Sequence, residues 1–183
     1  MRTTIRLPQQ IWVPRNVNGE PSDDKLIPVT NYGMKPCGGI WTSTYLDEGV
    51  CGWVQWCLDT ERFDWVERKP GWLLEPRVAD IYVIDSYSNL FELARLYGKE
   101  FTHYVHSLDF EAMIRDGIEA IHLTEAGLYS TCQRLDGWNL YGWDCESTIW
   151  FNWCFERVES LGTFDSKPAH FTQVTQLLTR EFA

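Results

Sequence analysis

The chain has 183 residues, of which 44% are hydrophobic; this is enough for one folded domain over residues 1–183 and argues against wholesale disorder. Its formal net charge is −10 and it has no basic run, which argues against nucleic acid as the main partner. No apolar stretch approaches the roughly 20 residues of a membrane-spanning helix, and the amino terminus lacks the apolar run of a signal peptide. We therefore expect a cytoplasmic protein that does not bind a membrane.

The first half of the chain is predicted to form strands and then one helix. Strands are predicted at three places: residues 10–15, 26–30 and 40–44. Pro28 would confine the second of these to a sheet edge. Apolar residues at helical spacing then predict a helix over residues 50–58, followed by a charged loop over residues 60–70.

In the second half, start and stop signals predict helices between strands. Strands are predicted over residues 81–84, 118–123, 138–141 and 147–153. Helices are predicted to begin after Ser86 or Ser88, after Asp109 and after Thr124, and a fourth to run from Ala169. Strands thus dominate both ends of the chain. This order predicts an α+β fold with mixed or antiparallel sheets and short flanking helices.

Aromatic residues and cysteines are both frequent. The ten Trp, eight Tyr and nine Phe make up 15% of the chain; they serve either as core residues or as the lining of a pocket for a flat ligand such as nicotinamide or adenine. The six cysteines include no Cys-x-x-Cys pair, so we expect buried reduced thiols. No ligand spacing fits a closed zinc site, and we expect no metal.

Two short segments carry groups suited to chemistry. In Trp41-Thr42-Ser43-Thr44, strand alternation places Ser43 on the face opposite Thr42 and Thr44. Hydroxyls on a strand that faces a pocket can bond a ribose or a carboxylate; alternatively, Thr simply favours strands and Ser ends them.

The second segment is Asp144-Cys145-Glu146. In an extended chain its two carboxylates share one face at about 6–7 Å, and their repulsion should raise the pKa of at least one of them. Carboxylates beside a sugar stabilise an oxocarbenium-like transition state. The alternative is a solvated strand entrance.

In this order, the two segments resemble the arginine–serine–glutamate branch of the ADP-ribosyltransferase fold. That branch has an arginine on its first strand, an aromatic-Ser/Thr-Ser-Ser/Thr strand, and a Glu- or Gln-x-Glu pair near its carboxy-terminal strands. Arg6 and Arg15 are the candidates for the arginine, and Arg15 is preferred because it ends a predicted strand. Asp144 departs from the family pattern, at a position that helps to select the acceptor. Residues 35–43 are also similar to small phage and bacterial proteins.

The resemblance implies that NAD is the substrate and that a protein, such as a host protein, is the acceptor. Glu146 would bond the ribose 2′-hydroxyl and stabilise positive charge, Ser43 would hold the ribose or orient Glu146, and Asp144 would activate or orient the acceptor. Residues implied to bind NAD are Arg15 at the phosphates, Trp41 or Tyr45 against nicotinamide, and Thr42 and Thr44 beside Ser43. Reaching this transition state requires no metal.

Other readings of the sequence remain open. His103 and His106 have a spacing that can bind metal, but they are better interpreted as polar loop residues. His122 is interpreted as a hydrogen-bonded core or rim histidine. The chain as a whole has two non-catalytic interpretations: an interaction protein that binds a host protein through exposed Trp and Tyr, or a domain that sequesters a nucleotide.

Overall fold

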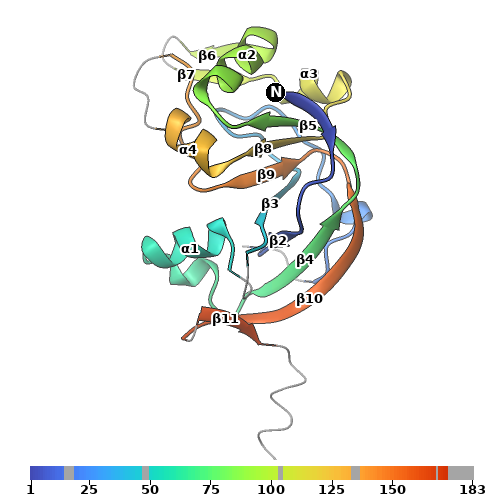
Figure 1. Cartoon of the computed structure of the whole chain (residues 1–183), viewed down its shortest axis with the longest axis vertical. Helices are drawn as coiled ribbons and strands as arrows, with labels where there is room; N and C mark the ends of the chain where they lie inside the picture. The colour runs from blue at the N-terminus through green and yellow to red at the C-terminus, as the bar shows by residue number, and fades with distance from the viewer. Residues whose placement is uncertain (15–18, 47–49, 103–104, 133–136, 168, 173–183) are drawn as a thin grey trace, which may run out of the picture.

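The computed structural model describes residues 1–14, 19–46, 50–102, 105–132, 137–167 and 169–172. Nine strands form one curved sheet in the order β1-β5-β8-β9-β3-β2-β4-β10-β11 (Figure 1). In chain order these strands are β1 (Arg2–Ile5), β2 (Gln10–Trp12), β3 (Ile40–Thr44), β4 (Pro70–Pro76), β5 (Ala79–Ile84), β8 (Ala120–Leu123), β9 (Ser147–Trp150), β10 (Phe155–Ser166) and β11 (Ala169–Thr172). Strands β5 and β8 are parallel and the other neighbours antiparallel, so the sheet is mixed. The fold class is α+β, as predicted.

The helices are short and lie around this sheet, and β6 (Gly98–Thr102) pairs with β7 (Val105–Leu108) in a separate two-stranded sheet. They are α1 (Gly52–Asp59), α2 (Tyr87–Tyr97), α3 (Phe110–Arg115) and α4 (Glu125–Thr131), with short 3-10 turns at Asp23–Lys25 and Phe63–Trp65. Figure 1 shows α2, α3 and α4 near the β5 end of the sheet and α1 near the β11 end. The predicted caps are confirmed, since Ser86, Asp109 and Thr124 each accept a bond from a backbone N–H three residues later.

The core lies on both faces of the central strands. On one face Ile84, Ile121 and Ile149 pack against α2 and α3, and on the other Trp150 packs with Phe155 and its neighbours. Strand β9 is therefore buried on both sides. A third cluster holds α1 against Ile11 and Phe164. No helix among the described residues is both long enough and apolar enough to cross a membrane.

Several predicted elements are wrong. Residues 26–30 form only one isolated bridge, Thr30 to Cys37, and residues 138–140 have no regular structure before a turn that begins at Tyr141, in place of the predicted strand. The predicted helix from Ala169 begins instead as β11, because its residues pair with β10; residues 173–183 lie outside the described residues. The strand predicted over residues 10–15 ends at Trp12. Strands β1, β4, β6, β7 and β10 were not predicted.

The glycines before β3 and the cysteines behave largely as their sequence context indicates. Gly38 has φ +85°, and a Cβ there would lie 2.3 Å from the Pro28 carbonyl oxygen, so this turn requires glycine. None of the six cysteines forms a disulfide, but Cys37 is exposed and Cys132 is only partly buried, so the expectation of burial fails at these two positions. Burial raises the pKa of the Cys51 and Cys145 thiols to about 12, which keeps them neutral.

Candidate functional site

The two segments that carry the sequence motifs meet in the structure. Strand β3 pairs with β9 on one side and with β2 on the other, so the end of β3 lies beside the start of β9. Across a separation of 103 positions, the Ser43 hydroxyl donates to the main-chain carbonyl of Glu146 at 2.9 Å. The same hydroxyl accepts a hydrogen bond from the backbone N–H of Trp53 at 3.2 Å. The Ser43 hydroxyl thus contacts the main chain of Glu146, whereas the Glu146 carboxylate is bonded by Thr44.

Thr44 holds the Glu146 carboxylate. Its hydroxyl donates to Oε1 at 2.8 Å and its backbone N–H to Oε2 at 3.0 Å. His122 Nδ1 lies 3.7 Å from Oε1, and the Glu146 side chain is 17% exposed. Burial raises the pKa of the Glu146 carboxyl, the Thr44 hydrogen bonds lower it in part, and Glu125 raises it further.

Asp144 does not share a face with Glu146, so that prediction is wrong. The backbone bends at Cys145 and Glu146, before β9 begins, and the side chains of Asp144 and Glu146 therefore contact different partners. Asp144 Oδ2 pairs with the Lys35 ammonium at 3.4 Å, while Glu146 contacts Thr44. The pKa of Glu146 is raised mainly by burial, and the charged neighbour that contributes is Glu125 rather than Asp144.

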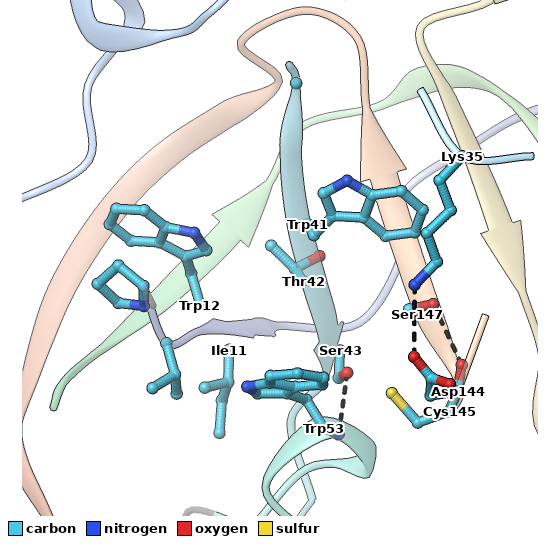
Figure 2. A pocket seen from close by; sticks show the side chains of 13 residues that line it. Ile11, Trp12, Lys35, Trp41, Thr42, Ser43, Trp53, Asp144, Cys145 and Ser147 are labelled. Atoms are coloured by element: carbon cyan, nitrogen blue, oxygen red, sulfur yellow. Dashed lines mark hydrogen bonds and ion pairs between the residues drawn. The ribbon is translucent and has the colours of Figure 1, made fainter. Parts of the chain in front are cut away.

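A cavity of about 360 Å³, which we call the tryptophan pocket, opens on the Ser43 side of β3. Figure 2 shows Trp12, Trp41 and Trp53 around it, contributed by β2, β3 and α1. Pairing between β2 and β3 stops after Ile11 and Ser43, and the pocket lies where the two strands separate. Its polar residues are Thr42, Ser43, Ser147 and the Lys35–Asp144 ion pair. Glu146 is not among the residues that line it, although its neighbours Cys145 and Ser147 are.

The other residues predicted to bind NAD do not all line the tryptophan pocket. Trp41 lines the pocket, meets Trp143 edge to face at 4.7 Å and has the Lys35 ammonium 5.3 Å from its ring. Thr42 also lines the pocket; its side chain is buried and its hydroxyl donates to Gln10. Tyr45 packs with the α1 cluster and does not line the pocket. Arg15 lies outside the described residues, although the preceding residue, Pro14, lines the pocket.

The other arginine candidate and the histidines occupy peripheral or core positions. Arg6 pairs at the surface with Glu156 at 2.9 Å. His103 lies outside the described residues, and the His106 ring packs against Trp138 with 4.9 Å between centroids. His122 is buried and bonds Thr148 Oγ1 at 2.9 Å, which confirms a hydrogen-bonded histidine.

Sequence reasoning missed four residues of the site: Gln10, Lys35, Trp12 and Trp53. A signal was present for Trp53, which lies on the apolar stripe of the predicted helix over residues 50–58. Gln10 and Lys35 gave none, because their partners Thr44 and Asp144 are distant in sequence. Over the described residues, no cluster of three or more His, Cys, Asp or Glu side chains is arranged to hold a metal ion.

Comparison with known proteins gives no relative: no family model, curated protein or solved structure matches the chain.

Proposed function

We propose that the chain is an NAD-dependent ADP-ribosyltransferase with an ADP-ribosyltransferase-like fold, which cleaves the nicotinamide–ribose bond and transfers ADP-ribose to a protein acceptor. The observation that carries this proposal is the contact between Ser43 and Glu146 at 2.9 Å. It brings the hydroxyl-rich strand and the acidic segment, on which the resemblance rests, to one place. The partly exposed Glu146 carboxylate is held there by Thr44.

Glu146 is the group suited to stabilising the transition state. As the bond between ribose C1′ and nicotinamide breaks, its electron pair leaves with nicotinamide and positive charge develops on the ribose. An ionised carboxylate in a largely buried site interacts strongly with that charge, and its fixed Thr44 donors need no reorganisation. A lone pair of the acceptor then bonds to C1′, and the acceptor loses its proton.

The tryptophan pocket supports binding of a planar ring. Three indole side chains and a few polar groups in about 360 Å³ are typical of a site for a flat heteroaromatic ligand. The resemblance pairs Trp41 or Tyr45 with nicotinamide, and of these two rings Trp41 lines the pocket. Because Cys145 and Ser147 line the pocket, a ring bound there would lie next to the segment that carries Glu146.

The test is release of nicotinamide from labelled NAD, with a cell lysate as the source of acceptor proteins. Glu146→Gln removes the charge and should reduce release at least 100-fold, which is the size of effect seen when a transition-state electrostatic contact is lost. Glu125→Gln is the matched control, because Glu125 is a nearby carboxylate that is not in contact with Thr44, and it should retain turnover. Release by Glu146→Gln at the wild-type rate, or no release by wild type, would refute the proposal.

Binding without chemistry is a second candidate, and it has its own supporting observation. Both oxygens of Glu146 already accept bonds from Thr44, and Glu146 does not line the tryptophan pocket. Exposed Tyr32, Tyr129 and Tyr141 also offer aromatic anchors for a host protein. NAD at about 100 times its dissociation constant would add roughly 2.7 kcal/mol to folding stability without turnover if the domain sequesters nucleotide. A co-purifying host protein without any NAD effect would indicate the interaction protein.

A further inference from the structure

A continuous line of side-chain hydrogen bonds crosses β9, β3 and β2 and ends at Glu146. Trp150 Nε1 donates to Thr42 Oγ1 at 2.9 Å, and Thr42 Oγ1 donates to Gln10 Oε1 at 2.8 Å. Gln10 Nε2 then donates to Thr44 Oγ1 at 3.3 Å, and Thr44 Oγ1 donates to Glu146 Oε1 at 2.8 Å. Gln10 is the central member, since it connects the two threonines.

The chemistry of the groups fixes the directions of the first three bonds in this line, and the fourth follows when Glu146 is ionised, because a carboxylate can only accept. The Trp150 indole can only donate, so the Thr42 hydroxyl proton is left for Gln10. Gln10 Nε2 also donates to the Pro8 carbonyl at 3.1 Å, which can only accept, so the amide orientation is determined. Nε2 therefore faces Thr44, whose own proton goes to Glu146.

Burial strengthens the line. Gln10 and Trp150 are 0% exposed and Thr42 is 3% exposed, so water does not compete for these groups. Loss of a hydrogen-bond partner lowers the folding stability far more when the polar group is buried than when it is exposed. Hydrogen bonds in a buried network also polarise, and so strengthen, one another. In the alternative arrangement a protonated Glu146 donates to Thr44, so the Thr44 hydroxyl accepts from both Gln10 Nε2 and Glu146, and its own proton must find an acceptor other than the carboxylate.

Among the residues that the structure describes, the groups that act on Glu146 supply no competing positive charge at neutral pH. His122 of β8 is neutral because burial lowers its pKa to about 4. The thiols of Cys51 and Cys145 are neutral, and Glu125 of α4 is a further carboxylate that raises the pKa of Glu146. The donors that favour the anionic form are those of Thr44.

We propose that Gln10 is a positioning residue that, through Thr44, holds the Glu146 carboxylate as a hydrogen-bond acceptor. Its catalytic consequence rests on the proposed function, whereas its effect on Glu146 itself does not. Loss of the Gln10 amide frees the Thr44 hydroxyl to rotate away from Oε1. The carboxylate then loses a donor and is harder to ionise.

The experiment follows the Glu146 side-chain carboxyl by ¹³C NMR as a function of pH, with its resonance assigned from Glu146→Gln. Gln10→Met keeps the length of the side chain and removes both hydrogen-bonding groups. We expect its Glu146 titration midpoint to move to higher pH than in wild type. Gln9→Met is the matched control at the adjacent, exposed glutamine and should leave the midpoint unchanged.

Turnover provides the second readout. In Gln10→Met, kcat should fall about tenfold, the loss of roughly one hydrogen bond, with KM unchanged and the acid limb of the pH–rate profile moved to higher pH. A shifted carboxyl titration without nicotinamide release by wild type would uphold the positioning role and discard the proposed activity. An unshifted titration in folded Gln10→Met overturns the inference.

If Gln10→Met does not fold, Thr42→Val tests the same positioning role by removing the bond that Thr42 donates to Gln10. It removes the hydroxyl that donates to Gln10 Oε1 and should move the Glu146 midpoint in the same direction. Thr42→Ser keeps the hydroxyl and should restore the wild-type midpoint. Equal midpoints in Thr42→Val, Thr42→Ser and wild type would overturn the inference.

Discussion

The buried His122 makes folding stability depend on pH in a defined direction. Its side chain is almost fully buried, and burial lowers its pKa from 6.5 to about 4, with Asp85 opposing the change in part. The unfolded chain therefore binds a proton near pH 6.5 that the folded protein does not bind until about pH 4. Stability from this group is fully present above pH 6.5 and is lost as the pH falls towards 4. This difference between the unfolded-state and folded-state pKa of His122 corresponds to on the order of 3 kcal/mol of folding stability.

Urea unfolding of wild type and His122→Asn between pH 7.5 and pH 4 tests this. The asparagine side chain cannot titrate but can still hydrogen-bond Thr148. Other groups with shifted pKa values, such as the Met1 amino group and Glu146, contribute in both proteins and cancel in the difference. We expect wild type to lose most of about 3 kcal/mol relative to the variant as the pH falls. Parallel pH profiles would show that His122 is protonated in the folded protein near its ordinary pKa.

Two further predictions concern a helix cap and the tryptophan pocket. Ser86→Ala should lower the free energy of unfolding by about 1 kcal/mol because it removes the N-cap bond to Asn89. Ser88→Ala, at an exposed position within α2, should change it by less than about 0.5 kcal/mol, and equal effects in urea unfolding would contradict the cap. Trp41→Leu should weaken NAD binding about fivefold by calorimetry, because stacking on an indole contributes about 1 kcal/mol; an unchanged dissociation constant would exclude Trp41 as the ring partner.

Local signals in the sequence predicted local structure well. Ser86, Asp109 and Thr124 act as caps on backbone groups three residues away, so the information lies within one helical turn. Strand β3 was predicted with its observed bounds because the glycines before it and its β-branched residues are contiguous. These elements needed no knowledge of distant partners.

Strands stabilised by distant partners were not predictable in the same way. Strand β10 has mostly exposed or half-exposed side chains and interrupts its pairing with β4 at two places, so its sequence shows no regular alternation. The sequence has apolar residues at helical spacing from Phe171 onward, yet pairing with β10 makes residues 169–172 a strand. In both cases the partner strand, rather than local propensity, determines the structure.

In the candidate site too, local features could be predicted from the sequence and contacts between distant residues could not. Alternation along β3 correctly separates Ser43 from Thr42 and Thr44, because a regular strand has a fixed period. Alternation failed for Asp144 and Glu146, since the chain bends before β9 and the period of a strand does not apply there. The pairing of Asp144 with Lys35 depends on a loop that is close in space and distant in sequence.

The contact between His122 and Glu146 admits two electrostatic interpretations, and burial decides between them. The 3.7 Å separation is within the range of an ion pair, but an ion pair would raise the pKa of the histidine and lower that of the carboxyl. The opposite is found for both groups: each is shifted mainly by burial towards its neutral form. His122 is already bonded to Thr148 and is uncharged at neutral pH. The Glu146 anion is therefore supported by the neutral donors of Thr44, so the bond that Gln10 makes to Thr44 bears directly on the charge of the carboxylate.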